Sequence, residues 1–258
     1  MDPEQRERQR WFLTDRVRMT VDWRNTDQNR GVAPPPVEKP APPGAERITL
    51  PAADDLEDIG EVSLREAIGR RASRRVYTGA PLSLAELSFL LWATQGVRRR
   101  AGPGAVYRTV PSAGCRHAFE TYLAVMNAEG LAPGLYRYLP LGHELVLVRR
   151  DDGLRPQLVD ATLGQTFCGA GAVTFIWTTV AHRMEWRYDL AAHRVIPIDA
   201  GHVGQNLYLA CEAIGAGTCT VAAYDQEALD RLVEVDGHDE FALYLAPVGK
   251  VARQGGHG

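Results

Sequence analysis

Residues 172–180 are the feature that most restricts the fold of this chain. They read Ala-Val-Thr-Phe-Ile-Trp-Thr-Thr-Val, a nearly continuous apolar run rich in β-branched and aromatic side chains. Such side chains favour the extended conformation, and a strand without polar alternation is typically buried on both faces. The run therefore predicts a central strand in a sheet that is covered on both sides.

Further strands and helices are expected around this run, without regular alternation between the two types. Strands are predicted over residues 119–126, 135–138, 144–149 and 241–248, with a tight connection at residues 140–143. Helices are predicted over residues 63–69, 83–96 and 203–214; in the first two, a serine followed three residues later by glutamate indicates a capping box. Because no βαβ order recurs, the predicted class is α+β, with one domain.

Residues 1–50 are predicted to be an N-terminal arm, and residues 51–258 the folded domain. Within the arm, residues 31–44 contain six prolines. Proline restricts its own backbone and lacks an N–H, so this composition predicts an extended polyproline stretch. The stretch is either a spacer or an arm that lies across a partner subunit.

The charge balance excludes several partners. A net charge of −3 gives the whole chain no electrostatic attraction to nucleic acid or to an anionic membrane. No apolar run reaches the roughly 18 residues that a membrane span needs, and the charged N-terminus is unlike a signal peptide. The four cysteines form no Cys-x-x-Cys pair, so we interpret them as reduced thiols, which indicates a cytoplasmic protein.

A basic segment, Arg-Ala-Ser-Arg-Arg at residues 71–75, follows the first predicted helix of the domain. Arg71, Ser73 and Arg75 alternate, so in an extended segment their side chains point the same way. Guanidinium groups give bidentate, charge-assisted hydrogen bonds, and a serine hydroxyl adds a neutral donor. The set predicts a phosphate cradle; the alternative is a solvated basic turn.

Two loops of small residues and one lysine extend this candidate site. The loops are Pro111-Ser112-Ala113-Gly114, before a predicted strand, and Gly215-Ala216-Gly217, after a predicted helix. Small side chains let a bulky planar ligand approach the backbone closely. Lys250, at the end of the last predicted strand, is a second candidate partner for a phosphate. An ordinary turn, a helix end and a surface lysine are the alternatives.

The sequence gives little support for other kinds of functional site. The seven histidines are scattered without metal-ligand spacing, so no metal site is predicted; Asp199, near His202, is interpreted as the cap of a helix that begins there. The glycines at 215–217 follow a helix instead of preceding one, which excludes a Rossmann loop. Nothing orients His117 as a base for Cys115. The three arginines at 98–100 are interpreted as a solvated loop, with an acidic ligand as the alternative.

The candidate site has four parts, which occur along the chain in the order 71–75, 111–114, 215–217 and Lys250. In this order they resemble the FMN-dependent nitroreductase family, over about residues 60–252. Residues 71–77 are similar to the family's Arg-Arg-Ser-x-Arg-x-Phe segment for the phosphate and ribityl groups, with Ala72 in place of the second arginine. Residues 111–114 resemble the second flavin loop, and residues 215–219 the loop whose amides face the flavin N5 and O4 edge. The resemblance implies a mainly antiparallel sheet flanked by helices, in an interlocked homodimer with two FMN sites at the subunit interface.

A closer resemblance is to the SagB-like branch, the thiazoline and oxazoline dehydrogenases that modify ribosomal peptides. It rests on residues 26–31 (Thr-Asp-Gln-Asn-Arg-Gly), 90–96 (Leu-Leu-Trp-Ala-Thr-Gln-Gly), 133–138 (Pro-Gly-Leu-Tyr-Arg-Tyr) and 199–207 (Asp-Ala-Gly-His-Val-Gly-Gln-Asn-Leu). Arg187 and Tyr188 stand where the branch has a Lys-Tyr pair implicated in azoline oxidation, which makes them the candidate catalytic residues for proton transfer. Arginine does not act as a base at neutral pH, so the pair departs from the branch. A second departure is Cys-Arg-His-Ala at residues 115–118, where the branch has an apolar residue, Tyr and Pro.

The resemblance assigns roles to the candidate site. Arg71, Arg75 and Lys250 would neutralise the FMN phosphate, Ser73 would bond phosphate or ribityl, and the small-residue loops would stack on the isoalloxazine, with hydride carried at N5. The expected function is FMN-dependent dehydrogenation of a thiazoline, oxazoline or related peptide-derived group. Two alternatives stay open: an NAD(P)H-dependent reductase of nitroaromatics or quinones, and a non-catalytic flavin-binding scaffold in a peptide-modification complex.

Overall fold

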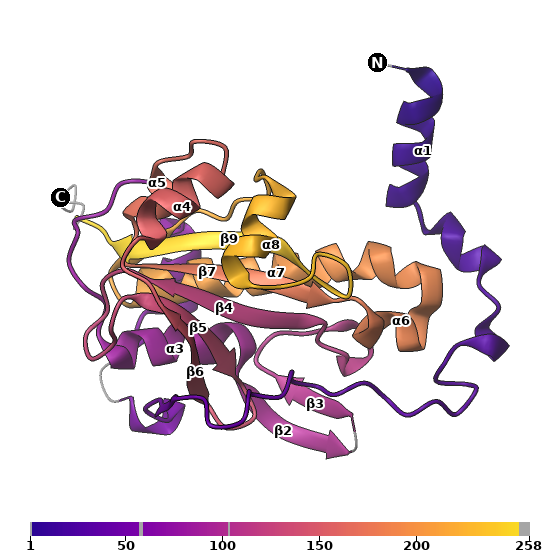
Figure 1. The fold of residues 1–258 in the computed structure, drawn as a ribbon, viewed down its shortest axis with the longest axis horizontal. Coiled ribbons are helices and arrows are strands. Elements are labelled where there is room, and N and C mark those ends of the chain that lie inside the picture. The colour runs from indigo at the N-terminus through magenta and orange to yellow at the C-terminus, as the bar shows by residue number, and fades with distance from the viewer. Residues whose placement is uncertain (1, 57–58, 103, 253–258) are drawn as a thin grey trace.

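The computed structural model describes residues 2–56, 59–102 and 104–252 (Figure 1). Its helices are α1 (Pro3–Leu13), α2 (Leu64–Arg70), α3 (Leu84–Gln95), α4 (Leu154–Ala161), α5 (Phe167–Ala170), α6 (His182–Tyr188), α7 (Ala192–Ala213) and α8 (Gln226–Val233). Its strands are β1 (Arg47–Thr49), β2 (Val97–Gly102), β3 (Ala105–Arg108), β4 (Phe119–Val125), β5 (Gly134–Leu139), β6 (Glu144–Arg150), β7 (Val173–Val180), β8 (Ala216–Thr218) and β9 (Glu240–Lys250).

The described residues form a seven-stranded sheet in the order β1-β6-β5-β4-β7-β9-β8. Every neighbouring pair in this sheet is antiparallel. In the central pair, Tyr122 of β4 lies opposite Ile176 of β7. The predicted α+β class, with a mainly antiparallel sheet flanked by helices, is confirmed.

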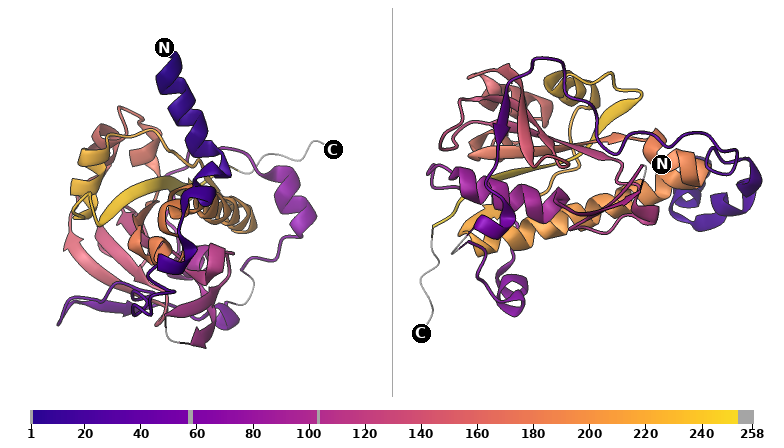
Figure 2. Two further views of the ribbon diagram at one scale, coloured as in Figure 1. Left: turned by 90° about the vertical axis from the view of Figure 1, so that its right-hand side faces the viewer. Right: turned by 90° about the horizontal axis from the view of Figure 1, so that it is seen from below.

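Strand β7 is the central strand that residues 172–180 predicted. It is buried along its length except at its last residue, which is half-buried. Phe175 and Trp177 point into a core with α3 and α7, whereas Ile176 points into a second core with α4 and α8. Each face of the sheet is therefore covered by a helical layer, and Figure 2 shows the long helix α7 running along one of these faces.

Helix α3 begins with the predicted capping box. The Ser83 hydroxyl accepts the amide N–H of Glu86 at 3.1 Å, and the Glu86 carboxylate accepts the amide N–H of Ser83 at 3.0 Å. Ser63 caps α2 by the same serine bond, at 3.2 Å, but the predicted capping box is only half formed there, because the Glu66 carboxylate pairs with Arg70. These local patterns were sufficient because both partners lie within four residues of one another.

Helix α7 starts well before the predicted residue 203. It begins at Ala192 and continues through Pro197, which places Asp199 about two turns inside the helix. The interpretation of Asp199 as a helix cap is therefore wrong. Proline and glycine in this segment suggest a helix start on propensity, but the buried stripe that includes Ile196 and Val203 holds the helix against the sheet, and tertiary packing overrides propensity.

Residues 98–100 are not a loop, contrary to the sequence interpretation. They lie in β2, which forms a separate two-stranded antiparallel hairpin with β3. All three arginines are exposed, and the Arg99 guanidinium lies 4.5 Å from the ring centre of Tyr107 on β3. Cross-strand pairing with an aromatic residue supports extended structure in a segment whose own sequence indicates a solvated turn.

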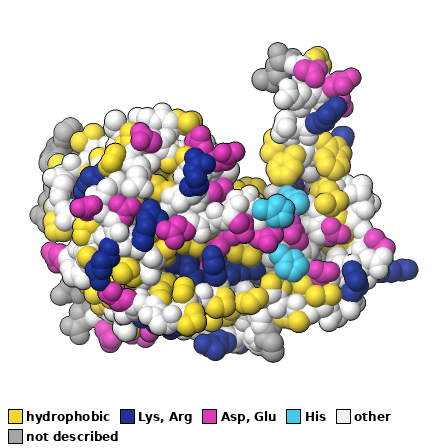
Figure 3. All heavy atoms as spheres, viewed as in Figure 1, with side chains coloured by type: hydrophobic (Ala, Val, Ile, Leu, Met, Phe, Trp, Pro, Cys, Tyr) yellow, Lys and Arg dark blue, Asp and Glu magenta, His cyan; other side chains and the backbone are white. Residues whose placement is uncertain are grey.

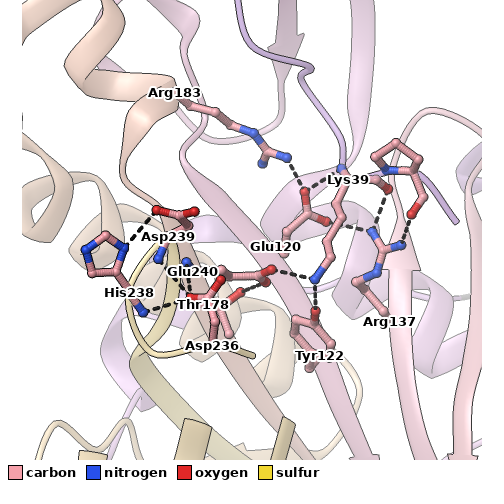
Figure 4. A network of polar contacts seen from close by, with 11 residues as sticks. Lys39, Glu120, Tyr122, Arg137, Thr178, Arg183, Asp236, His238, Asp239 and Glu240 are labelled. Atoms are coloured by element: carbon pink, nitrogen blue, oxygen red, sulfur yellow. Dashed lines mark hydrogen bonds and ion pairs between the residues drawn. The ribbon is translucent and has the colours of Figure 1, made fainter. Parts of the chain in front are cut away.

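The proline-rich segment, residues 31–44, is bound by side chains of its own chain, and we call it the strap; Figure 4 shows its Lys39 beside Glu120 and Arg137. Arg137 on β5 donates to the carbonyl oxygens of Lys39 at 2.7 Å and Pro40 at 2.9 Å. Arg108 donates to the carbonyl oxygen of Val37 at 2.8 Å, and the Glu120 carboxylate accepts the amide N–H of Lys39 at 2.8 Å. Side chains from the main sheet and from the β2–β3 hairpin thus bind the backbone groups that a polyproline segment leaves unpaired.

A buried carboxylate lies at the centre of this attachment. Glu120 bonds both Arg137 and Arg183, and all three residues are almost fully buried. Burial alone would raise the pKa of Glu120, but the Arg183 and Arg137 charges outweigh it and hold that pKa below its ordinary value. The Lys39 ammonium adds an ion pair to Glu240 at 2.6 Å, next to Thr178 (Figure 4).

The N-terminal helix α1 stands away from the rest of the molecule (Figures 1 and 3). Arg194 of α7 holds its end by a bond to the carbonyl oxygen of Leu13 at 3.0 Å and an ion pair with Asp15 at 3.4 Å. Strand β1 follows the strap and pairs with β6, so residues on both sides of position 50 contact the sheet. The division of the chain at residue 50 stays a prediction. No described helix is long and apolar enough to cross a membrane.

Candidate functional site

The basic segment after α2 lies along the edge of the main sheet. Ser73 forms a parallel bridge with Thr218 of β8, and the amide N–H of Arg74 donates to the Thr218 carbonyl oxygen at 2.8 Å. Four residues later, the amide N–H of Thr78 donates to the carbonyl oxygen of Lys250 at 2.9 Å. The segment is therefore extended, and it joins three of the sequence-predicted elements: residues 71–75, the loop at 215–217 and Lys250.

The three side chains of the predicted cradle do not all point to one place. The Arg71 guanidinium lies 5.3 Å from the ring centre of Tyr208 on α7, and the Ser73 hydroxyl lies 3.0 Å from the Tyr208 hydroxyl. The Arg75 guanidinium lies instead 5.5 Å from the ring centre of Phe167 on α5. Arg71 and Ser73 therefore share a neighbour that Arg75 does not.

The charges of the two outer arginines are not balanced by the carboxylates that the structure describes. Among the described residues, no carboxylate forms an ion pair with Arg71 or Arg75. The hydroxyl of Thr218, whose backbone pairs with Ser73, is buried and has no hydrogen-bond partner in the described part of the chain. A guanidinium without a carboxylate partner is suited to an anionic ligand with several acceptor oxygens.

The loop at 215–217 allows close approach of the backbone. Gly215 has a positive φ of 64° and open space where a side chain would stand, because it reverses the chain between α7 and β8. At Gly217, a Cβ would lie 2.5 Å from the Arg74 side chain. The second glycine thus makes room for the basic segment, whereas the first leaves an exposed turn.

Lys250 is already engaged by its own chain. Its ammonium group pairs with the Glu86 carboxylate of α3 and donates to the carbonyl oxygen of Ile214 at 2.7 Å. In this arrangement Lys250 fastens β9 to the ends of α3 and α7. Its role as a phosphate partner stays a prediction.

The loop at Pro111-Ser112-Ala113-Gly114 lies near the other end of α7. Both carboxylate oxygens of Asp199 accept from the amide N–H of Ala113, at 3.2 and 3.4 Å. Burial raises the pKa of Asp199, although hydrogen bonds from Ser112 and Ala113 act in the opposite direction. Asp199, which the sequence interpretation treated as a cap, instead holds the backbone of this loop.

The candidate catalytic pair is packed on the same loop. Gly114 has a φ of 58°, and a Cβ there would lie 2.7 Å from the Tyr188 hydroxyl oxygen and 2.8 Å from Arg187 Nε. Arg187 and Tyr188 are both half-buried, and the Arg187 guanidinium lies 5.6 Å from the centre of the Tyr188 ring. The absence of a side chain at Gly114 is thus what lets α6 approach the loop.

The residues that depart from the SagB-like pattern hold this loop to its surroundings. Arg116 is buried over the Trp186 ring and donates to the carbonyl oxygens of Arg183 at 3.0 Å and Gly104 at 2.8 Å. His117 is buried, and its amide N–H donates to the Ser112 hydroxyl at 3.0 Å. Burial, with the charges of nearby arginines, lowers the pKa of His117 to about 3, so its imidazole is neutral.

The candidate residues therefore form two groups joined by one helix. Asp199 holds the loop at 111–114, and Tyr208, nine residues further along α7, holds Ser73. Nine residues of helix span about 13 Å at the α-helical rise. Sequence reasoning missed Tyr208; its only signal was a tyrosine at the border of the apolar stripe of a predicted helix. The described residues contain no group of three or more potential metal ligands.

Comparisons with known proteins give the family. The model of the nitroreductase family matches residues 68–250, which is most of the chain. The chain belongs to the nitroreductase family. The family is one of oxidoreductases, and the matched segment includes Arg71, both small-residue loops and the Arg187-Tyr188 pair. The nitroreductase part of the sequence resemblance is thereby confirmed.

Two curated relatives match the chain with different sequence identity and coverage. The "putative nitroreductase" of Methanocaldococcus jannaschii is 33% identical over 195 residues, which are 76% of this chain and 94% of that protein. The trifolitoxin-processing protein TfxB of Rhizobium leguminosarum is 25% identical over 161 residues, which are 61% of this chain and 43% of that protein.

Several solved structures share the fold. A putative nitroreductase from Ralstonia eutropha has a TM-score of 0.66 and 28% identity over 86% of this chain and 98% of its own. A putative nitroreductase from Anabaena variabilis has a TM-score of 0.65 and 24% identity over 83% of this chain, which spans only 43% of that protein. The E. coli microcin synthetase McbBCD complex, with truncated pro-MccB17 bound, has a TM-score of 0.58 and 20% identity over 83% of this chain and 78% of that one.

Proposed function

We propose that this nitroreductase-family protein binds FMN and oxidises a thiazoline, oxazoline or related peptide-derived group. The observation that carries the cofactor proposal is the pair Arg71 and Ser73, which both contact Tyr208, with no carboxylate among the described residues paired to Arg71. An uncompensated guanidinium with adjacent hydroxyl donors is suited to a phosphate. The small residues at 111–114 and 215–217 fit the approach of a flat ring system to the backbone.

A homodimer is part of this proposal. The exposed face of α7 carries Ile198, Gly201 and Gln205, and no described residue lies within 4 Å of a Cβ placed at Gly201. A helix face with an exposed isoleucine and a glycine is suited to close contact with a second copy. This face lies between Asp199 and Tyr208, so a second copy docked there would border both groups of site residues.

The proposed reaction is the aromatisation of an azoline ring. This step breaks two C–H bonds: one hydrogen leaves with its electron pair and the other leaves as a proton. Bound FMN would supply the two-electron acceptor. The chain must move the proton, and the Tyr188 hydroxyl at the Gly114 loop is the candidate relay. The Arg187 guanidinium would orient an acceptor group of the substrate.

Two relatives support a peptide substrate. TfxB is named as a trifolitoxin-processing protein, and the McbBCD complex was solved with truncated pro-MccB17 bound. The likeness to TfxB is a sequence match, whereas the likeness to McbBCD is one of fold. A reductase that takes electrons from NAD(P)H is the second candidate, because the relative with 33% identity is named a nitroreductase.

The first experiment is an absorption spectrum of the purified protein before and after heat release of the ligand. We expect flavin bands near roughly 370 and 450 nm and release of FMN rather than FAD. A protein that is colourless and stays so after FMN is added would contradict the proposal and favour the scaffold alternative.

The second experiment separates the two enzyme functions. Under anaerobic conditions, the holoenzyme is mixed with an azoline-containing peptide or with NADH, and flavin bleaching is followed. Bleaching by the peptide, with formation of an azole that is about 2 Da lighter because two hydrogens leave, supports the dehydrogenase. Bleaching by NADH alone supports the reductase. The variant Tyr188→Phe should lower the rate of azoline oxidation at least about 100-fold with unchanged FMN content, whereas Tyr107→Phe on the β2–β3 hairpin should behave as wild type.

A further inference from the structure

Tyr208 connects two parts of the candidate site that are far apart in the sequence. Its hydroxyl oxygen accepts the amide N–H of Thr220 at 3.0 Å and lies 3.0 Å from the Ser73 hydroxyl oxygen. Its ring lies beneath the Arg71 guanidinium, 5.3 Å from the ring centre. One side chain therefore fixes both a cation and a hydroxyl of the basic segment relative to the residues that follow β8.

The tyrosine is itself held by a second tyrosine. The Tyr244 hydroxyl donates to Thr220 Oγ1 at 2.6 Å, and Thr220 Oγ1 lies 3.4 Å from the Tyr208 hydroxyl oxygen. Gly204, one turn before Tyr208, makes this packing possible, because a Cβ there would lie 2.9 Å from the Tyr244 ring. Four hydroxyl groups thus form a row from Tyr244 to Ser73.

The direction of the hydrogen bonds in this row follows from counting donors. Thr220 Oγ1 accepts from Tyr244, so its own hydrogen is free to point toward Tyr208. The Tyr208 oxygen already accepts the Thr220 amide, and its single hydrogen is then best placed on the shorter contact, to Ser73. Ser73 is exposed and accepts from Tyr208, which leaves its own hydrogen pointing outward.

We propose that the row Tyr244, Thr220, Tyr208, Ser73 is a polarised hydroxyl chain that makes Ser73 a donor to a phosphate oxygen, with Tyr208 as its positioning residue. This inference rests on the proposed function and deepens it, because it commits Ser73 to the phosphate instead of the ribityl group. A phosphate dianion only accepts hydrogen bonds, so a donor fixed in direction binds it better than a rotating hydroxyl. The ring of Tyr208 contributes separately by holding Arg71.

The test compares affinities for FMN and for riboflavin, which lacks the phosphate. Tyr208→Phe keeps the ring under Arg71 and removes the hydroxyl. We expect this variant to weaken FMN binding about fivefold to tenfold, the net worth of an ordinary hydrogen bond between neutral groups such as the one from Tyr208 to Ser73, and to leave riboflavin binding unchanged. Tyr208→Leu also removes the ring and should weaken FMN binding further. The matched control is Tyr224→Phe, whose hydroxyl donates to the carbonyl oxygen of Ala242 in the second core.

A double-mutant cycle decides whether the two residues act together. Ser73→Ala should weaken FMN binding about as much as Tyr208→Phe, and the double variant should be no weaker than Ser73→Ala alone. Tyr244→Phe, which interrupts the row two steps away, should give a smaller effect of the same sign. It replaces Tyr208→Phe as the probe if that variant does not fold.

Several results would overturn the inference. Additive effects in the cycle would mean that Tyr208 does not act through Ser73, and an equal loss of riboflavin affinity would place Ser73 away from the phosphate. If the wild type binds no FMN, the proposed function fails on its own. The hydroxyl chain is then tested with inorganic phosphate, which should raise the Tm of the wild type more than that of Tyr208→Phe; equal shifts would reject the chain.

Discussion

Asp199 and Ala113 are joined by a hydrogen bond across 86 residues of sequence, with 3.2 Å between the Ala113 amide nitrogen and Asp199 Oδ2. The bond ties the loop at 111–114 to the interior of α7. Asp199 is buried and its pKa is raised, mainly by that burial. The carboxylate that positions this loop is therefore also a group whose ionisation costs stability.

Asp199→Asn should gain stability relative to the wild type as pH rises. Because the folded pKa of Asp199 lies above its ordinary value of 3.8, the folded protein binds more protons than the unfolded chain between these two values. Wild-type stability then falls as pH rises from below 3.8 through the folded pKa, by up to about 1.4 kcal/mol per pH unit within that window. Asparagine does not titrate, so the difference between the two proteins isolates this group.

Urea denaturation of both proteins at several pH values, from about 3.5 to about 7, measures the effect of this ionisation. The quantity to compare is the free energy of unfolding of Asp199→Asn minus that of the wild type. If this difference stays constant or decreases as pH rises, the prediction is wrong. Asp199→Ala serves as the control, because it leaves the Ala113 N–H without its acceptor and should cost about 1–3 kcal/mol.

His117→Asn should flatten the acid side of the stability profile. The folded pKa of His117 is about 3, against an ordinary value of 6.5, because of burial and the Arg108 and Arg116 charges. Between these values the unfolded chain binds the proton, so wild-type stability falls as pH falls from 6.5 toward 3, by up to about 1.4 kcal/mol per pH unit. Asparagine also tolerates the positive φ of 47° at this position.

Chemical denaturation between about pH 3.5 and about pH 7.5 provides the measurement. His238→Asn is the control, since the His238 side chain is 91% exposed and this variant should keep the wild-type slope. If His117→Asn also keeps the wild-type slope, the histidine is not held neutral in the folded protein.

Glu120→Gln should destabilise the protein and loosen the strap. The substitution leaves Arg137 and Arg183 buried without their shared carboxylate, and breaking a buried ion pair costs about 3–5 kcal/mol. Hydrogen exchange should accelerate at the amide of Lys39, which donates to Glu120. Glu46→Gln is the matched control, because its exposed pair with Arg150 should be worth less than about 1 kcal/mol. Equal losses for the two variants would show that the buried carboxylate does not hold the strap.

Arg71→Ala should reduce FMN affinity more than Arg75→Ala. Arg71 shares Tyr208 with Ser73, whereas Arg75 lies over Phe167. Removing a charged donor to a phosphate costs about 1.5–3 kcal/mol, which is about tenfold to 150-fold in the dissociation constant. Fluorescence titration of the apoprotein with FMN measures this. Arg100→Ala, an exposed arginine on β2, controls for loss of general positive charge. A larger loss for Arg75→Ala would reverse the assignment within the basic segment.

Local patterns in the sequence were enough for several elements of the fold. The apolar run at 172–180 predicted a strand buried on both faces, and β7 is that strand. The serine–glutamate spacing predicted the start of α3 to within one residue, because the bonds that fix it join residues within one turn. Such features depend on neighbours along the chain, so they can be read without knowing the fold.

Features that depend on distant contacts were decided by the tertiary structure. The residue types around Asp199 are typical of a helix start. Packing of Ile196 and Val203 against the sheet nevertheless keeps the residues before Asp199 helical, so Asp199 lies inside α7 and its carboxylate accepts from the Ala113 amide. The strap's path likewise depends on arginines that arrive from β3 and β5.

In the candidate site, too, some features follow from local sequence and others depend on distant contacts. The basic segment and the two small-residue loops could be recognised from residue types, because phosphate and planar-ring chemistry restrict which residues serve. The sequence could not reveal that Lys250 pairs with Glu86, or that Tyr208 bonds Ser73, since 164 and 135 residues separate these partners. The sequence determined which chemical groups were present, and only the close packing of α7 against β8 and β9 decided which of them meet, because a hydrogen bond requires contact within about 3 Å.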